Sequence, residues 1–215
     1  MMDDEFTKID LLHGYFNILL FKDLVGRYRI ENIVTLKELL RNLTLGFTKE
    51  VNINTTYKML KSKNIQLSPA TLYDYYDHIK SIFYGHELEN FFSPKGQKKL
   101  YLNNIGFHYL FSRSTDFGQS FENVIFRELK KVYDKLYFKK GNQEIDFFIP
   151  EKNLHVQACY ALTQNDFPRE IAPLQKVEGE KVVVYRQKSD LCPEKEGVKI
   201  LHLLDFVKEY CSSSR

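Results

Sequence analysis

The sequence predicts an α+β protein, with an N-terminal all-α winged helix-turn-helix domain over residues 1–105 and an α/β domain over residues 106–215. Two observations predict this division. Apolar residues recur at helical spacing through most of the first part, which ends in a hairpin pattern. In the second part, strand-like runs are separated by helical stretches, which is typical of a sheet with crossover helices.

The composition is that of an ordinary globular protein, with 43% hydrophobic residues to form a core. A net charge of +3 is too small to indicate a nucleic-acid partner, so any basic surface must be local. No apolar run approaches the roughly 18 residues of a membrane span, and the acidic N-terminus does not resemble a signal peptide. The cysteines at 159, 192 and 211 follow no metal or disulfide spacing. We therefore expect a cytoplasmic protein with free thiols.

The stretch from residue 6 to about residue 30 is predicted to be helical. Its apolar residues recur at helical spacing: Leu11, Leu12, Tyr15, Phe16, Leu19 and Leu20. The run is apolar on more than one face, which a small domain would struggle to cover, so we expect it to pack against a further domain. No Gly-x-x-x-x-Gly-Lys-Ser/Thr loop occurs in the sequence, so this chain is not itself a P-loop ATPase.

Three helices follow, each with a candidate N-cap. Thr35 is expected to cap the first helix, and Asn54 or Thr55 to open the second. Ser68 is expected to cap the third, with Pro69 at its first position. Three helices followed by a hairpin form a winged helix.

The hairpin has predicted strands at 89–92 and 99–102 and a basic tip. In the DNA-binding use of this unit, the third helix enters the major groove and the wing contacts phosphate. The candidate contacts with double-stranded DNA are Thr71, Tyr75, His78 and Lys80 on the helix, and Lys95, Lys98 and Lys99 on the wing. Asp74 and Asp77 oppose phosphate approach, so a protein partner is an equal alternative.

The second domain contains a predicted β-hairpin with strands at 144–149 and 154–160, joined by a Pro-Glu-Lys-Asn turn. Alternation places Glu144 and Asp146 on one face, opposite Ile145 and Phe147. If the turn centres on its Glu and Lys, Asp146 faces the glutamine at 157 and Glu144 faces the cysteine at 159. A one-residue slip would remove that pairing.

A helix with a third carboxylate precedes the hairpin. Its apolar stripe consists of Phe121, Val124, Ile125, Leu129 and Val132. Glu122 lies at the edge of this stripe. Either the helix dipole and partial solvation stabilise this carboxylate, or it meets Asp146 and a third group around a divalent cation.

The remaining elements complete the α/β pattern. A helix opened by Asn165 or Asp166 is expected to end or kink at Pro173. Two short apolar strands follow at 181–185 and 198–202, and then a last helix.

The acidic residues resemble a known nuclease pattern. Glu122, Glu144-Ile-Asp146 and Gln157 are similar to the constellation of the PD-(D/E)XK, or restriction-endonuclease-like, superfamily. More closely, the chain resembles the C-terminal region of a group of prokaryotic AAA-type P-loop ATPases, in which a winged helix and a nuclease-like domain of unknown function follow the ATPase domain. The stretches that carry this resemblance are 21–28, 72–76, 121–124, 157–160 and 169–171.

This resemblance implies a restriction-endonuclease-like fold for residues 106–215. It also implies a catalytic set of Glu122, Glu144, Asp146 and Gln157, in which Glu122, Asp146 and Gln157 would hold Mg²⁺ or Mn²⁺. Two positions depart from the pattern. Gln157 is uncharged where an acid is usual, and Cys159 stands where the superfamily has a lysine. Lys130, Lys139 or Lys140 could substitute for that lysine.

Two functions follow from the resemblance. In the first, the chain is a non-catalytic module that binds DNA or a partner for an AAA-type ATPase domain, in the same or a longer chain. In the second, it is a Mg²⁺- or Mn²⁺-dependent DNA endonuclease. The missing lysine and the uncharged Gln157 favour the first, because a complete site needs both ligands and an electrophilic group. A homo-oligomer is compatible with either, and the chain is either a fragment of a longer protein or a free-standing relative.

Overall fold

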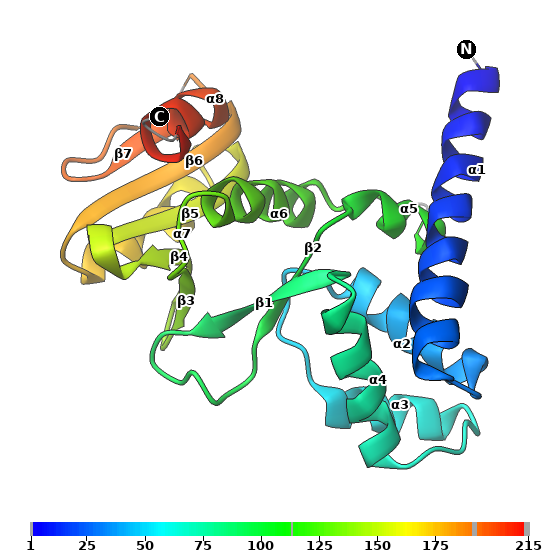
Figure 1. Ribbon diagram of the computed structural model, residues 1–215. Helices are drawn as coiled ribbons and strands as arrows, with labels where there is room; N and C mark the ends of the chain where they lie inside the picture. The colour runs from blue at the N-terminus through cyan, green and yellow to red at the C-terminus, as the bar shows by residue number, and fades with distance from the viewer. Residues whose placement is uncertain (1, 113, 191–192, 213–215) are drawn as a thin grey trace. The chain divides into compact units, whose positions relative to one another are not determined.

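The computed structural model describes residues 2–112, 114–190 and 193–212 (Figure 1). It confirms a mixed α/β protein and divides into two compact units. The first comprises Met1–Glu87 and Lys99–Thr115, and the second Leu88–Lys98 and Asp116–Arg215. This division differs from the predicted boundary near residue 105, because the segment that begins at Leu88 pairs with a strand of the second unit.

The first unit is mainly helical. Its elements are α1 (Met2–Ile18), the π-helical η1 (Leu19–Gly26), α2 (Ile33–Leu45), α3 (Ile53–Ser62), α4 (Pro69–Ser81), the start of β1 (Gly85–Asn90), β2 (Lys99–Leu102), η2 (Ile105–Phe107) and α5 (His108–Phe111). Leucines from successive helices fill its core, among them Leu20, Leu36, Leu39, Leu60 and Leu72. None of the described helices in either unit is long and apolar enough to cross a membrane.

The observed N-caps of α2, α3 and α4 match the predicted caps in one case of three. Ser68 caps α4, with Pro69 at its first turn, as predicted. The other two caps were predicted two or three residues too late. Asn32 caps α2 by accepting the Thr35 N–H at 3.0 Å, and Asn52 caps α3 by accepting the Thr55 N–H at 3.0 Å. Each threonine is therefore the third residue of its helix, where its main-chain N–H donates to the cap, and is not itself the cap.

The hairpin strands were predicted in part. β2 occupies the predicted residues, whereas β1 begins at Gly85 and ends at Asn90, so the two phenylalanines at 91 and 92 lie outside it. The end of β1 pairs in parallel with the second unit's β3, with Glu89 opposite Tyr137.

The second unit is built on a mixed sheet. Its elements are α6 (Phe117–Lys130), β3 (Tyr137–Lys140), β4 (Glu144–Ile149), η3 (Pro150–Lys152), β5 (Leu154–Leu162), α7 (Phe167–Ile171), η4 (Leu174–Lys176), β6 (Glu180–Lys188), β7 (Lys199–His202), α8 (Leu203–Phe206) and η5 (Val207–Cys211). From the end of β1, which pairs with β3, the strand order continues β3-β4-β5-β6-β7. β3, β4 and β5 are antiparallel, and β5, β6 and β7 are parallel. The short strand β3 was not predicted.

The β4–β5 turn and register follow the prediction. Asn153 adopts the left-handed conformation at φ 44°, directly after a 3₁₀ turn that begins at Pro150. The ladder runs from Ile149–Leu154 to Phe147–Val156, which is the predicted register. It does not extend to the predicted Asp146–Gln157 and Glu144–Cys159 pairs.

A β-bulge in β4 changes which residues share a face. From Phe148 to Ile145, β4 advances three residues while β3 advances two, from Tyr137 to Lys139. Strict alternation would put Ile145 beside Phe147, but Ile145 packs in the apolar cluster of α7, whereas Phe147 contacts Phe126 of α6. The predicted sharing of faces is therefore wrong on the N-terminal side of the bulge.

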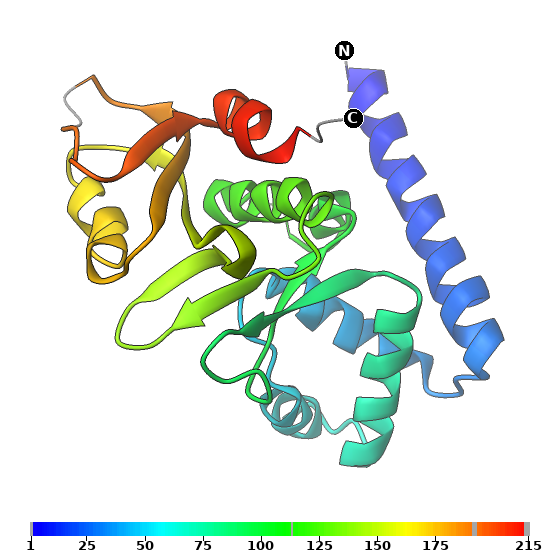
Figure 2. The same cartoon turned by 60° about the vertical axis from the view of Figure 1, so that its left-hand side comes forward.

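Two helices cover opposite faces of β5. Helix α6 lies along one face of the sheet (Figure 2). Its Phe117 and Phe121 contact the Tyr160 ring, with ring centroids 5.2 and 6.0 Å apart. On the other face, Ile171 of α7 packs in the cluster that contains Cys159. This arrangement determines which helix each β5 side chain can meet.

Candidate functional site

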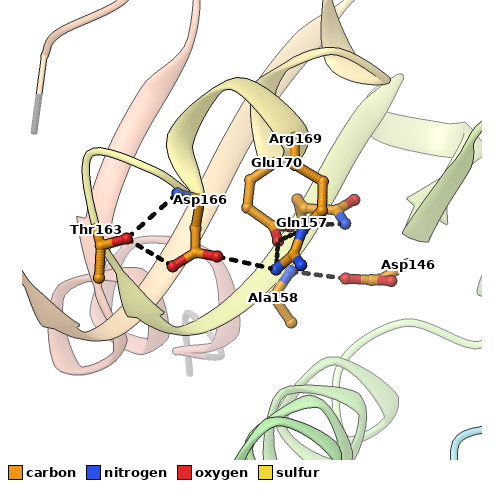
Figure 3. Close-up of polar contacts among 7 residues, drawn as sticks. All are labelled: Asp146, Gln157, Ala158, Thr163, Asp166, Arg169 and Glu170. Carbon is orange, nitrogen blue, oxygen red and sulfur yellow. Dashed lines mark hydrogen bonds and ion pairs between the residues drawn. The ribbon is translucent and has the colours of Figure 1, made fainter.

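Asp146 lies at the point where the β4–β5 ladder ends (Figure 3). Its side chain is only 7% exposed, and its Oδ2 accepts the Ala158 N–H at 2.8 Å. The Asp146 side chain thus accepts a hydrogen bond from a main-chain N–H of β5, at the point where the β4 backbone no longer pairs with β5. This contact links β4 to β5 beside the bulge.

Gln157 is held by α7. Its side chain is buried, and its Nε2 donates to Oε2 of Glu170 at 3.1 Å. Its Oε1 is buried without a hydrogen-bond partner in the described structure. The amide therefore points to the α7 side of β5, opposite the face that α6 covers.

Glu170 was not among the predicted site residues. It is buried, and its Oε1 accepts from both Nε and Nη2 of the exposed Arg169, at 3.0 and 2.7 Å. This carboxylate raises the pKa of the Arg169 guanidinium. The only signal in the sequence was that Arg169-Glu-Ile171 belongs to a stretch that carries the resemblance.

The contacts continue to the surface along the start of α7. Nη2 of Arg169 lies 3.5 Å from Oδ1 of Asp166, and Oδ2 of Asp166 accepts the Thr163 hydroxyl at 2.6 Å. We call Gln157, Glu170, Arg169, Asp166 and Thr163 the α7 network (Figure 3). It connects a buried sheet position to solvent through alternating donors and acceptors.

Cys159 occupies an apolar environment. It is buried in a cluster with Ile145, Leu162, Ile171 and Val183. Burial, and then the Glu170 carboxylate, raise the pKa of this thiol to about 12. At neutral pH it is therefore an uncharged core side chain, which can be neither an activated nucleophile nor a replacement for a lysine cation.

The predicted acids come from separate parts of the unit. Glu122 lies on α6 and is partly exposed, and Glu144 lies at the start of β4 with Lys140 as its strand partner. Because α6 and the Gln157 amide lie on opposite faces of β5, Gln157 does not fit a metal ion shared with Glu122. Among the described residues, no group of three or more His, Cys, Asp and Glu side chains is placed to hold a metal ion.

The three lysines that could replace the missing one are also accounted for. Lys130 donates to the Asp134 carbonyl at 3.1 Å. Nζ of Lys139 lies 2.8 Å from Nε2 of His155. Lys140 is exposed at the end of β3.

No family model matches the sequence, and no solved structure matches it either. The chain is 30% identical over 186 residues to an uncharacterised protein of Methanocaldococcus jannaschii, covering 82% of this chain and 42% of the relative. It is 21% identical over 220 residues to an uncharacterised protein of Haemophilus influenzae, covering 96% of this chain and 54% of the relative. The chain thus spans about half the length of these curated relatives.

In the first unit, the predicted DNA-contacting face of α4 is largely engaged in other contacts. Tyr75 is only 8% exposed, so its predicted outward position is wrong. The His78 ring stacks on Tyr28, with centroids 3.8 Å apart. Nζ of Lys80 lies 2.9 Å from Asp77 and 3.5 Å from Glu87. Lys80, a predicted DNA contact of the helix, is therefore paired with carboxylates.

The remaining predicted DNA contacts differ in accessibility. Thr71 is partly exposed and donates its N–H to the Ser68 hydroxyl at 3.0 Å. Lys95 is exposed at the tip of the predicted wing. Lys98 pairs with Glu89 at 2.7 Å. Lys99 is only 4% exposed, so its predicted phosphate contact is wrong.

Helix α1 has apolar residues on two faces, as the sequence indicated. Phe16 is buried in the core of the first unit together with Leu20 of η1. Leu11, Tyr15 and Ile18 are exposed and recur at helical spacing. We call these three residues the α1 stripe.

Proposed function

We propose that this chain is a non-catalytic docking module for an AAA-type ATPase, composed of a winged helix and a restriction-endonuclease-like domain that has lost its metal site. The observation that carries the proposal is the buried Gln157–Glu170 hydrogen bond. It commits the residue at a nuclease ligand position to a structural contact on the face away from α6.

The order of elements in the second unit supports a nuclease-derived fold. Helix α6 is followed by three antiparallel strands, and α7 then connects β5 to the parallel strand β6. Asp146, the acid that the resemblance places at the centre of the site, lies at a bulge where two strands separate. Bulges often occur beside active sites, where they redirect a side chain.

Gln157 and Cys159 are the two positions that differ from the nuclease pattern, and their surroundings support loss of catalysis. A nuclease of this class needs metal ligands and a group that stabilises charge on the phosphate. Gln157 is engaged by Glu170, and Cys159 is an uncharged core residue. The retained Asp146 bonds to the β5 backbone, which gives it a structural role without a metal.

The surface of the first unit favours protein over DNA as the partner. The exposed acids Asp74 and Asp77 flank the α4 face, and the Lys80 cation is paired. The α1 stripe offers an apolar surface that a protein can bury. The relatives are about twice as long as this chain, so the ATPase domain we propose as the partner could belong to the same longer protein. The free thiols Cys159 and Cys211 fit a cytoplasmic location.

The first prediction concerns cleavage. Incubated with plasmid DNA and Mg²⁺ or Mn²⁺, the chain should produce no nicking above the level of its Asp146→Asn variant. This variant keeps an oxygen acceptor for the Ala158 N–H and removes the charge that a metal needs. Nicking that Asp146→Asn abolishes, and that the exposed-acid control Asp134→Asn leaves intact, would establish the endonuclease and end the docking proposal for this domain.

The second prediction concerns DNA affinity. Fluorescence anisotropy with a labelled duplex should give binding no tighter than the roughly 10⁻⁴–10⁻⁶ M of non-specific contacts, with a shallow salt dependence. The reason is that Lys80 and Lys98 already pair with carboxylates. Tighter binding that weakens steeply with salt, and that Lys95→Gln reduces while Lys152→Gln does not, would make DNA the partner of the wing.

A further inference from the structure

A small cavity in the second unit lies on the α7 side of the sheet and is separate from the α7 network. Its lining includes Phe92, Lys139, Asn142, Gln143 and Lys176, and its volume is about 240 Å³. This is below the roughly 300–1,000 Å³ of pockets for drug-sized ligands, so the cavity suits a small molecule. It is open to solvent at its polar residues, most of which are exposed.

Aromatic rings surround the Lys139 amine. Nζ lies 3.5 Å from the centroid of the Phe148 ring, 5.2 Å from that of Phe91 and 5.8 Å from that of Phe92. In the described part of the chain, no carboxylate forms an ion pair with Lys139. Desolvation lowers the pKa of this amine, because the rings replace water that would solvate the ammonium. More of the amine is therefore in its nucleophilic form at neutral pH than for a solvated lysine.

His155 positions the amine without neutralising it. It is 1% exposed, and burial, followed by the Lys139 charge, lowers its pKa to about 4, so it is neutral at pH 7. Its Nε2 lies 2.8 Å from Nζ and, with the ring proton on Nδ1, accepts one N–H of the amine. The ring also stacks on Phe148, which limits its movement. The amine is thus held at the cavity wall, and its lone pair remains available.

The cavity has the groups that an anion requires. Lys176 contributes a second cation from η4, and no ion pair to it is found among the residues that the structure describes. Asn142 and Gln143, in the β3–β4 turn, bring side-chain amides that can donate to a carboxylate or phosphate. Phe92 provides an apolar wall beside them. The lining contains no acidic residue, so an anion would meet no repulsion there.

We propose that Lys139 is a nucleophilic amine that forms an imine with the carbonyl group of a small organic anion bound in this cavity. Nζ attacks the carbonyl carbon, and the C–N bond forms as the oxygen takes up a proton. The resulting carbinolamine loses its hydroxyl group as water, while the nitrogen loses its remaining protons as the C=N bond forms. The net change is one amine and one carbonyl converted to one imine and one water, so no oxidant or reductant is needed.

The test uses glyoxylate, a small aldehyde that carries a carboxylate. The intact chain is incubated at pH 7 with glyoxylate and cyanoborohydride, which reduces any imine to a stable carboxymethyl-lysine, and labelling at each lysine is followed by peptide mass spectrometry. Lys139 should be labelled severalfold faster than Lys140, its exposed neighbour on the same strand. Inorganic phosphate should slow labelling at Lys139 and leave Lys140 unchanged.

Variants test the anion contact. Lys176→Gln should slow labelling at Lys139 severalfold, whereas the exposed-lysine control Lys152→Gln should have no effect. Equal rates at Lys139 and Lys140 in the unmodified chain would overturn the proposal, and this comparison needs no variant to fold. Faster labelling at Lys139 that neither phosphate nor Lys176→Gln reduces would also overturn it, because the cavity would then play no part in recognition.

Discussion

Lowering the pH from about 6.5 to about 4 should reduce the free energy of unfolding of the second unit by about 3 kcal/mol through His155 alone. Burial and the Lys139 charge lower the pKa of this histidine to about 4, from about 6.5 in an unfolded chain. Lys181 on β6 acts in the same direction, whereas the main chain at Glu180 opposes it. Between these two pKa values the unfolded state binds the extra proton, so stability rises with pH; each unit is worth about 1.4 kcal/mol. The contribution is complete above about pH 6.5 and lost as the pH falls towards 4.

Urea unfolding followed by circular dichroism at several pH values measures this effect. Carboxylates titrate in the same range, so the decisive quantity is the difference between the wild type and His155→Phe, which keeps a ring against Phe148. The free energy of unfolding of this variant should rise less steeply with pH than that of the wild type, by the amount that His155 contributes. The control His13→Gln, at an exposed histidine of α1, should keep the wild-type slope. Equal slopes for the wild type and His155→Phe would mean that the histidine is not buried as a neutral group.

Local chemistry explains what could be predicted from the sequence. The Pro150–Asn153 turn depends on residues that favour its backbone angles, and the β4–β5 register follows from the length of that turn. Ser68 was recognisable as a cap because Pro69 marks the first turn of α4. At α2 no proline marks the start, and the prediction named Thr35, whereas the cap is Asn32. The hydrogen bond between them settles which one is the acceptor.

The candidate site shows where local patterns fail. Alternation cannot reveal a bulge, and the bulge moves Ile145 to the face opposite Phe147. Nor can it show which helix covers which face of a strand. Gln157 was correctly placed on β5, but its partner Glu170 lies on a helix that reaches it only through the crossover connection. The same limitation hid the contact between Lys139 and His155, because β3 was not recognised as a strand.

Replacing Glu170 with leucine should lower the free energy of unfolding of the second unit by about 1–3 kcal/mol. The substitution leaves the buried Nε2 of Gln157 without its acceptor, and an unsatisfied buried donor costs that amount. Arg169→Ala should also destabilise the unit, by up to the roughly 3–5 kcal/mol lost when a buried charge is left without its partner, because the buried Glu170 carboxylate loses the guanidinium that pairs with its Oε1. Urea unfolding of each variant gives both values.

The double variant Gln157→Leu with Glu170→Leu decides what the glutamine is for. If the amide serves only to satisfy Glu170, replacing both partners with apolar side chains should recover most of the stability that Glu170→Leu loses, since neither buried polar group is then unpaired. If Gln157 is instead a metal ligand, millimolar Mg²⁺ or Mn²⁺ should stabilise the wild type and not the double variant, because a ligand that binds only the folded state raises its stability. Recovery without any metal effect supports a structural glutamine, and hence a domain retained for docking, whereas metal stabilisation confined to the wild type would return Gln157 to the nuclease site.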